Sequence, residues 1–277
     1  MEIFDRGGEV EVAGVVDFDP VKIFECGQCF RWDADENGVY TGVARGRIAR
    51  LRKEGGSVYI TSTLEDFDTV WRDYFDLGRD YEEVRRKLCI DDYMREATAF
   101  GAGIRILRQD RWEALCSFIV SQCNNIPRIK KIISGLCRLY GDEFVFEGKT
   151  YNTFPPPSRL AALRAEDLAP IRCGYRDGYI INAARAVDSG ELDLEALSRL
   201  TPETARNSLK ILRGVGNKVA DCALLFGFNM LNAFPVDVWM RRAVAEQYGP
   251  SFDPRMFSPY AGIAQQYIFY YARAREH

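Results

Sequence analysis

The pattern of apolar and polar residues changes in character near residue 65 of the chain. Before that point, short segments alternate apolar and polar side chains and are separated by turn sequences such as Glu36-Asn37-Gly38 and Glu54-Gly55-Gly56. This pattern is typical of β-strands joined by tight turns. It predicts an antiparallel meander whose strands lie at residues 9–12, 29–32, 39–43, 47–51 and 57–61.

From about residue 65 onward, apolar residues recur at spacings of three and four, which predicts amphipathic helices. One helix is expected at residues 110–122. Another is expected to begin at Asn124-Asn125-Ile126-Pro127 and to end at Gly141, because asparagine caps helices well, proline is tolerated in the first turn and glycine often follows the last. Further helices are expected at residues 160–171, 178–187, 203–212, 217–228 and 258–274.

The two patterns together predict an α+β protein. We expect an N-terminal antiparallel sheet domain with flanking helices at residues 1–108, packed on a mostly helical domain at residues 109–277. The chain has 277 residues, 47% of them apolar and 28% charged, which is enough to bury a substantial core. It holds no apolar run near the roughly 20 residues of a membrane span, and its first residues lack the features of a signal peptide. The sequence therefore predicts a soluble, intracellular protein that does not associate with membranes.

Composition also narrows the possible chemistry. The only histidine is His277, so Ser-His-Asp or Cys-His catalysis and histidine-bound metal hydrolysis would depend on the last residue. Eight cysteines are scattered along the chain, and Cys26-Gly27-Gln28-Cys29 is the only Cys-x-x-Cys sequence. Without a second pair or a nearby histidine it is poor evidence for a metal site, and we expect none. Carboxylates, lysines, cysteines and tyrosines remain as candidate acids, bases and nucleophiles.

The net charge of −3 is distributed unevenly. Residues 101–140 hold seven bases and two acids, a local net charge of 7 − 2 = +5. A basic face of this kind suits contacts with DNA phosphates. It is equally typical of an ordinary solvated helix face, so charge alone leaves both interpretations open.

The strongest chemical signal is Lys218, which lies two residues after the turn Gly214-Val215-Gly216 and is followed by a carboxylate at Asp237 within Pro235-Val236-Asp237. The glycines permit a tight turn between two helices, and the free N–H groups at the start of the second helix can hold a phosphate. This order of residues indicates an amine nucleophile close to DNA. The alternatives are an ordinary helix connection with a solvated lysine, and an Asp237 that only caps the next helix.

With these residues assembled, the chain resembles the 8-oxoguanine DNA glycosylase/lyases of the helix-hairpin-helix superfamily over nearly its whole length. The resemblance implies a sheet domain packed on a two-lobed helical glycosylase domain. It implies a base excision repair enzyme that removes 8-oxoguanine, preferably opposite cytosine, by lysine attack on C1′ and Schiff-base β-elimination, without a cofactor. We expect a monomer that acts on double-stranded DNA and is located with the genomic DNA inside the cell, which in a bacterium means the cytoplasm or nucleoid. The matching segments are residues 27–32, 121–129, 174–176, 214–222 and 235–238.

The resemblance assigns catalytic and base-binding roles to particular residues. Lys218 would be the nucleophile, and Asp237 would stabilise positive charge on the sugar. The backbone carbonyl of Gly27 would accept the N7–H that only the oxidised base carries, whereas guanine would present a lone pair there. The predicted pocket is completed by Gln265, which would read the Watson–Crick edge, and by Phe269 and Cys222, which would sandwich the ring.

The same resemblance assigns the space left by the flipped base and the opposite cytosine. Tyr175 would wedge beside the cytosine, Arg128 and Arg176 would bond to its acceptors, and Asn125 would help to fill the gap. The turn residues Gly214, Val215 and Gly216 would hold a phosphate beyond the lesion, which positions the DNA without reading its sequence.

Two residues depart from the family pattern. Cys123 stands where eukaryotic members usually have the first of three asparagines, and Trp239 stands where they have a histidine near a phosphate. Neither departure affects Lys218 or Asp237. Two other functions are compatible with parts of the sequence: a sister glycosylase for another damaged or mismatched base, and a non-catalytic helix-hairpin-helix DNA-binding module. Monofunctional sister enzymes usually lack the hairpin lysine, and a binding module would not need both Lys218 and Asp237.

Overall fold

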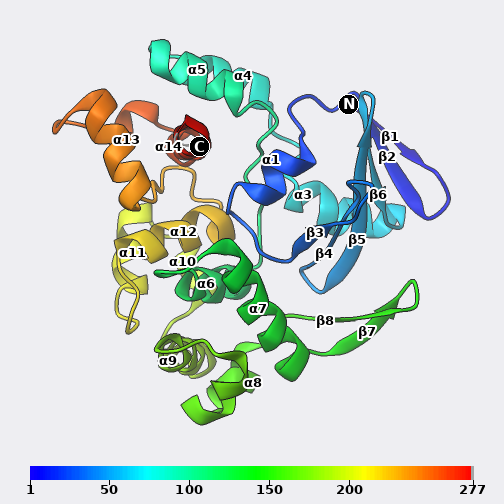
Figure 1. Ribbon diagram of the computed structural model, residues 1–277, viewed down its shortest axis with the longest axis vertical. Helices are drawn as coiled ribbons and strands as arrows, with labels where there is room; N and C mark the ends of the chain where they lie inside the picture. Colours follow the sequence, from blue (N-terminus) through cyan, green and yellow to red (C-terminus); the bar gives the residue numbers. More distant parts are fainter. Residues whose placement is uncertain (276–277) are drawn as a thin grey trace.

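A six-stranded antiparallel sheet lies beside a larger body of helices (Figure 1). The computed structural model describes residues 1–275. The exclusion of histidine chemistry depended on His277, which lies outside the described residues. No helix within residues 1–275 is long and apolar enough to cross a membrane. The strands of the main sheet are β1 (Glu2–Asp5), β2 (Glu9–Ala13), β3 (Trp32–Ala34), β4 (Tyr40–Ala44), β5 (Arg47–Glu54) and β6 (Ser57–Thr61).

The predicted meander is confirmed for β3 to β6, which pair in sequence order, but the whole sheet has the order β1-β2-β6-β5-β4-β3. Strand β2 therefore pairs with β6 on the far side of the meander, and β1 forms an edge that the sequence did not predict. The strand expected at residues 29–32 was placed too early, because β3 begins at Trp32. Cys29 and Phe30 precede it in a loop, where both side chains are buried; two successive buried side chains do not fit a half-buried strand.

Large aromatic side chains fill the space between the sheet and the first helix, α1 (Pro20–Glu25). Phe24 of α1 stacks on Trp32 with ring centroids 4.4 Å apart, and Trp32 donates a hydrogen bond of 2.9 Å to the hydroxyl of Tyr74. Gly42 on the neighbouring strand makes room for this ring, since a Cβ at that position would lie 2.1 Å from it. The sheet and α1 therefore form one apolar core.

Short helical turns follow the sheet and lead to two amphipathic helices. The turns are α2 (Leu64–Asp66), the π-helix η1 (Phe67–Trp71) and α3 (Arg72–Tyr74), and the helices are α4 (Tyr81–Leu88) and α5 (Asp92–Phe100). The buried residues of α4 and α5 belong to the core of the helical body, not to the core under the sheet. The domain division at residue 108 stays a prediction.

Helices α6 (Arg111–Val120) and α12 (Asn217–Phe228) lie at the centre of the helical body, where most of their residues are buried. Asp110 caps α6. The predicted asparagine cap of α7 (Ile126–Tyr140) is present, since Asn125 accepts a hydrogen bond from the backbone of Arg128. The remaining helices are α8 (Pro157–Ala161), α9 (Arg176–Asp188), α10 (Leu194–Leu197), α11 (Pro202–Leu209), α13 (Val238–Tyr248), α14 (Ala261–Arg275) and the 3₁₀ helices η2 (Ala165–Ile171) and η3 (Pro254–Phe257).

Several predicted helix boundaries were wrong. The single helix expected at residues 160–171 is divided into α8 and η2, and Pro170 inside η2 cannot donate the hydrogen bond of a regular helix. The helix expected at 203–212 ends at Leu209, α9 begins two residues before its predicted start, and α14 begins after Pro259 instead of at 258. A hairpin of β7 (Glu143–Phe146) and β8 (Lys149–Asn152) was not expected, and its largely exposed strands give no alternating signal.

Candidate active site

The turn between α11 and α12 depends on Gly214. Its φ is +84°, and a Cβ there would lie 2.3 Å from the ring of Tyr179. Gly216 is the N-cap of α12 and provides no capping side chain, so the first N–H groups of the helix are open to an acceptor from outside. An ion pair of 2.6 Å between Arg206 and Asp221 joins the two helices behind the turn. The geometry is that of a helix-hairpin-helix with an open phosphate position.

Replacing Gly214 by alanine should therefore destabilise the hairpin. We expect the free energy of unfolding to fall by about 1–3 kcal/mol, because the new methyl group meets Tyr179 and the backbone is left-handed. The affinity of the variant for duplex DNA should fall as well, because the turn that is proposed to bind a phosphate is distorted. Gly178→Ala is the matched control, since a Cβ there meets nothing within 4 Å and lies inside α9; it should leave stability unchanged or raise it. Denaturant titration of both variants measures this, and equal stabilities would contradict the assigned role of Gly214.

A cavity of about 50 Å³ lies where α12, α14 and the loop after α1 meet. Every residue that was predicted for catalysis and base binding lines it. These six residues are Gly27, Lys218, Cys222, Asp237, Gln265 and Phe269. The described lining also includes Cys26, Phe118, Phe226, Pro235 and Gln266.

Lys218 enters this cavity from the first turn of α12. Its Nζ donates a hydrogen bond of 3.2 Å to the hydroxyl of Ser121 at the end of α6, and it lies 5.4 Å from the ring centre of Phe118. The Phe118 ring in turn stacks on Phe226 at 5.2 Å. The amine is thus held at the end of an otherwise apolar wall.

Asp237 occupies the N-cap of α13, where its Oδ1 accepts a hydrogen bond of 2.8 Å from the backbone N–H of Met240. The capping role that the sequence offered as an alternative is therefore present. This capping role is compatible with a place at the cavity, because Asp237 also lines the cavity. The cap fixes the carboxylate at the cavity wall.

The cysteine side chains of the cavity are poor nucleophiles. Burial raises the pKa of the Cys222 thiol to about 11 and that of the Cys26 thiol to about 12. Both thiols are therefore neutral near pH 7, and the thiolate is the reactive form. The neutral thiols can still pack against a flat ring. Of the candidate nucleophiles at the cavity, Lys218 is then the one left to consider.

The residues predicted for the opposite base gather at the ends of α6, α7 and α9. Tyr175 is 53% exposed and packs edge-on against Tyr179 at 5.6 Å. Arg128 is exposed and donates a hydrogen bond of 3.4 Å to the carbonyl of Arg172, while Asn125 caps its helix. Asn125 and Arg128 lie at the start of α7, and Tyr175 lies at the start of α9.

Arg176 is buried, whereas Tyr175 and Arg128 are exposed. It is only 3% exposed, and its guanidinium donates hydrogen bonds to the backbone carbonyls of Gln122, Cys123 and Cys173. In this structure it holds the loop that carries Cys123, whose backbone is left-handed with a φ of +45°. A contact between Arg176 and a cytosine would require some of these bonds to be exchanged, and that contact stays a prediction.

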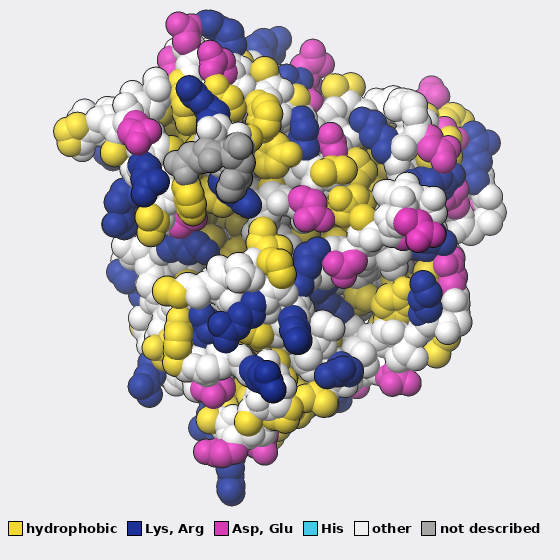
Figure 2. All heavy atoms as spheres, in the orientation of Figure 1, with side chains coloured by type: hydrophobic (Ala, Val, Ile, Leu, Met, Phe, Trp, Pro, Cys, Tyr) yellow, Lys and Arg dark blue, Asp and Glu magenta, His cyan; other side chains and the backbone are white. Residues whose placement is uncertain are grey.

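The basic stretch at residues 101–140 is divided in the structure. Arg105 is buried, Arg108 pairs with Asp73 and Asp76, and Arg111 pairs with Glu195. The other bases lie on α7, and Figure 2 shows Lys and Arg side chains spread over the part of this face that α7 occupies in Figure 1. Those bases are Arg128, Lys130, Lys131 and Arg138.

Comparison with known proteins agrees with this geometry. Residues 12–115 match the family described as the N-terminal domain of 8-oxoguanine DNA glycosylase. A probable N-glycosylase/DNA lyase of Methanothermobacter thermautotrophicus is 33% identical over 228 residues, which cover 72% of each chain. The chain belongs to the 8-oxoguanine DNA glycosylase/lyase family.

Solved structures of family members share the whole fold. An 8-oxoguanine glycosylase/lyase of Clostridium acetobutylicum, in complex with double-stranded DNA containing cytosine opposite 8-oxoguanine, is 38% identical, with a TM-score of 0.94 over 100% of this chain and 99% of that one. MBOgg1 in complex with a low-affinity DNA ligand is 43% identical, with a TM-score of 0.95 over 100% and 99% of the two chains. The expected fold class, a sheet domain beside a helical glycosylase domain, is confirmed.

Two polar residues that contact the predicted site residues received no role from the sequence. Ser121 is within hydrogen-bond reach of Lys218 only because the end of α6 meets the start of α12. Gln266 donates a hydrogen bond of 2.7 Å to Gln265, while its own Oε1 is buried with no hydrogen-bond partner within residues 1–275. A helical pattern places Gln266 beside the predicted pocket face, but only the three-dimensional structure shows that it reaches the cavity.

The two residues that depart from the family pattern both have exposed side chains. Cys123 is exposed in the loop that Arg176 holds. Trp239 is 42% exposed in the first turn of α13, and the guanidinium of Arg242 lies 5.5 Å from its ring centre. An exposed indole can pack against a sugar or base, and its N–H can donate to a phosphate, but unlike a protonated histidine it carries no positive charge.

Proposed function

We propose that this chain is a DNA glycosylase and AP lyase that excises 8-oxoguanine from double-stranded DNA in base excision repair. The observation that carries the proposal is the meeting of Lys218, Asp237 and the Gly27 loop at one cavity. The lysine and carboxylate provide covalent chemistry, and the loop provides a backbone acceptor for the base. The relatives named N-glycosylase/DNA lyase support the same pair of activities.

In the first step, the neutral amine of Lys218 attacks C1′ of the damaged nucleotide. The bond from C1′ to N9 breaks, and its electron pair leaves with the base, which takes up a proton. The carboxylate of Asp237 lies at the same cavity and would stabilise the positive charge that develops on the sugar. Opening of the sugar ring then yields a Schiff base between Nζ and C1′.

The lyase step follows from that Schiff base. The carboxylate of Asp237 would take a proton from C2′, the electrons of that C–H bond would move toward the cationic imine, and the 3′ phosphate would leave as the C3′–O bond breaks. Water then hydrolyses the remaining imine and frees Lys218. Neither step oxidises or reduces a group outside the protein and the DNA.

Selection of 8-oxoguanine would come from the Gly27 carbonyl. The oxidised base carries a hydrogen on N7 and would donate it, whereas guanine would place its N7 lone pair against the oxygen. The buried amide of Gln265 would read the opposite edge of the base, and Phe269 and the neutral Cys222 thiol would enclose its ring. Extruding the base costs a few kcal/mol, which these contacts would offset.

The preference for cytosine opposite the lesion should depend on Arg128. Because a good arginine–base pair gives about 1–3 kcal/mol of discrimination, Arg128→Ala should reduce the ratio of excision rates opposite cytosine and opposite adenine about tenfold. Arg138→Ala is the control, since Arg138 is exposed near the other end of α7. Single-turnover excision from the two duplexes measures the ratio. An unchanged ratio in Arg128→Ala would assign cytosine reading to another residue.

Association with DNA follows from the family. We further propose that the enzyme acts as a monomer on genomic DNA, because all six predicted catalytic and base-pocket residues come from one chain. Sedimentation of the protein with and without a lesion duplex tests this. A complex with two protein copies per duplex would overturn it.

The function itself is tested with duplexes that contain 8-oxoguanine opposite each of the four bases, undamaged guanine, or an alkylated adenine. We expect base release and strand cleavage from 8-oxoguanine, fastest opposite cytosine, and neither reaction from guanine. Excision of the alkylated adenine alone would instead identify a sister glycosylase. Tight binding to all duplexes without any cleavage would identify a non-catalytic DNA-binding protein.

A further inference from the structure

Gly27 lies in a tight loop whose conformation is set by the side chain of Gln28. The backbone of Gly27 is left-handed, with a φ of +86°, and Gln28 is 0% exposed. The amide nitrogen of Gln28 donates to the carbonyls of Ile23 at 2.9 Å and Arg105 at 2.8 Å, while its amide oxygen accepts from the N–H of Leu107 at 2.9 Å. Every part of this amide is therefore used to join the loop to two other segments.

The backbone of Gln28 is held as well. Its carbonyl accepts a hydrogen bond of 2.6 Å from the side chain of Gln109, and the backbone N–H of Gln109 donates one of 2.9 Å to the carbonyl of Phe226. Phe226 belongs to α12, the helix that carries Lys218. A short chain of hydrogen bonds thus connects the Gly27 loop to the helix of the nucleophile.

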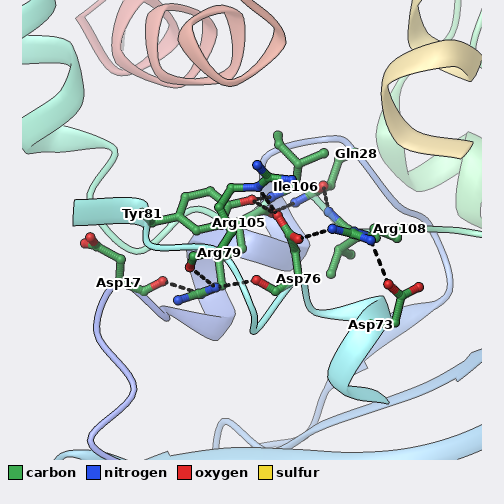
Figure 3. A network of polar contacts seen from close by, with 10 residues as sticks. Asp17, Gln28, Asp73, Asp76, Arg79, Tyr81, Arg105, Ile106 and Arg108 are labelled. Carbon is green, nitrogen blue, oxygen red and sulfur yellow. Dashed lines mark hydrogen bonds and ion pairs between the residues drawn. The ribbon is translucent and has the colours of Figure 1, made fainter. Parts of the chain in front are cut away.

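The segment at residues 105–109 is itself fixed from the other side (Figure 3). The hydroxyl of Tyr81 accepts a hydrogen bond of 2.8 Å from the N–H of Ile106 and donates one of 3.0 Å to Asp76. Burial raises the pKa of Tyr81 well above its usual value, so the hydroxyl keeps its proton and remains a donor. Arg105 donates to four backbone carbonyls, and Arg108 pairs with Asp76 at 2.6 Å. The support beneath Gln28 is therefore rigid.

We propose that Gln28 is a positioning residue that fixes the Gly27 carbonyl relative to Lys218 and thereby sets the selection of 8-oxoguanine. The proposal rests on the proposed function. A single hydrogen bond at N7 can select the oxidised base only if the acceptor stays in place. A carbonyl that could move away would lose part of the bond to 8-oxoguanine and would also escape the repulsion from the N7 lone pair of guanine.

The test separates base recognition from the rest of the chemistry. Gln28→Met removes the donors and the acceptor at similar volume. We expect the single-turnover rate of 8-oxoguanine excision to fall about tenfold or more, because a base contact that is slightly misplaced lowers the rate by such factors. Cleavage of a duplex that already contains an abasic site needs Lys218 but no base contact, and its rate should stay within about twofold of the parent. The affinity ratio of 8-oxoguanine over guanine DNA, measured with Lys218→Gln added, should also fall.

Two further variants distinguish positioning from general support of the fold. Tyr81→Phe removes one buried hydroxyl beneath residues 105–109, whereas the contacts of Arg105 and Arg108 still hold that segment. It should therefore lower the melting temperature without changing the ratio of excision to abasic-site cleavage. Gln109→Met removes the donor to the Gln28 carbonyl and should lower that ratio as Gln28→Met does. It provides the test if Gln28→Met does not fold.

The inference is overturned if excision and abasic-site cleavage fall in parallel in the Gln28 and Gln109 variants, or if excision is unchanged in both. It is also overturned if Tyr81→Phe lowers the ratio as much as they do. A parent enzyme that cleaves abasic sites but releases no 8-oxoguanine would instead contradict the proposed function. The two failures are therefore distinguishable.

Discussion

Replacing Lys218 by glutamine should abolish both base excision and strand cleavage while leaving lesion binding largely intact. Glutamine keeps a polar side chain that can still donate to Ser121, but it has no amine to attack C1′. We expect the single-turnover excision rate to fall by at least about a thousandfold, which is typical for the loss of a covalent nucleophile. Affinity for an 8-oxoguanine duplex should change little, because the turn at Gly214 and the rest of the cavity are unaltered.

The matched control is Lys210→Gln, which removes the same charge from an exposed lysine just after α11. It should retain the parent excision rate. If Lys218→Gln excised 8-oxoguanine at a rate comparable with Lys210→Gln, the nucleophile would have to be another group. If Lys218→Gln also lost its affinity for the duplex, the lysine would contribute mainly to binding.

Asp237→Asn should slow base excision by about a hundred- to a thousandfold, the range found when one transition-state-stabilising group is removed. Asparagine is as good an N-cap as aspartate, so the hydrogen bond to the Met240 N–H can persist and the fold should keep its stability. The variant thus isolates the carboxylate charge from the capping role. Single-turnover kinetics and thermal melting measure the two effects separately.

Asp237→Ala completes this comparison because it removes both the charge and the cap. It should lose about 1 kcal/mol of stability in addition to the catalytic defect. A parent-like excision rate in Asp237→Asn combined with a slow rate in Asp237→Ala would mean that Asp237 acts only by shaping the start of α13. That outcome would assign charge stabilisation to another residue.

Much of the fold could be predicted because local signals agree with the final structure. Helices α6 and α7 combine apolar periodicity with the caps Asp110 and Asn125, and the glycine turn separates α11 from α12. The errors occur where local signals are weak or where a loop is buried. Edge strand β1 and the β7–β8 hairpin are largely exposed, and Cys29 and Phe30 owe their burial to packing and not to a strand.

The members of the site could be identified from motifs, but their support could not. Lys218 and Asp237 are visible because a turn, a lysine and a Pro-Val-Asp sequence occur in a fixed order. The contacts of Lys218 with Ser121 and of Gln28 with Arg105 and Leu107 join residues that are about 80 or more positions apart. Such pairs leave no periodic pattern in one sequence. The same is true of Arg176, because its motif does not reveal that its guanidinium already donates hydrogen bonds to backbone carbonyls.

The central claim is that Lys218 becomes covalently attached to the damaged nucleotide. The most direct measurement is to incubate the enzyme with a duplex that contains 8-oxoguanine opposite cytosine in the presence of borohydride, digest the product and locate the adduct by mass spectrometry. The account predicts a reduced sugar–DNA fragment on the peptide that contains Lys218, and no adduct with undamaged guanine. An adduct on a different residue, or base release without any adduct, would contradict it.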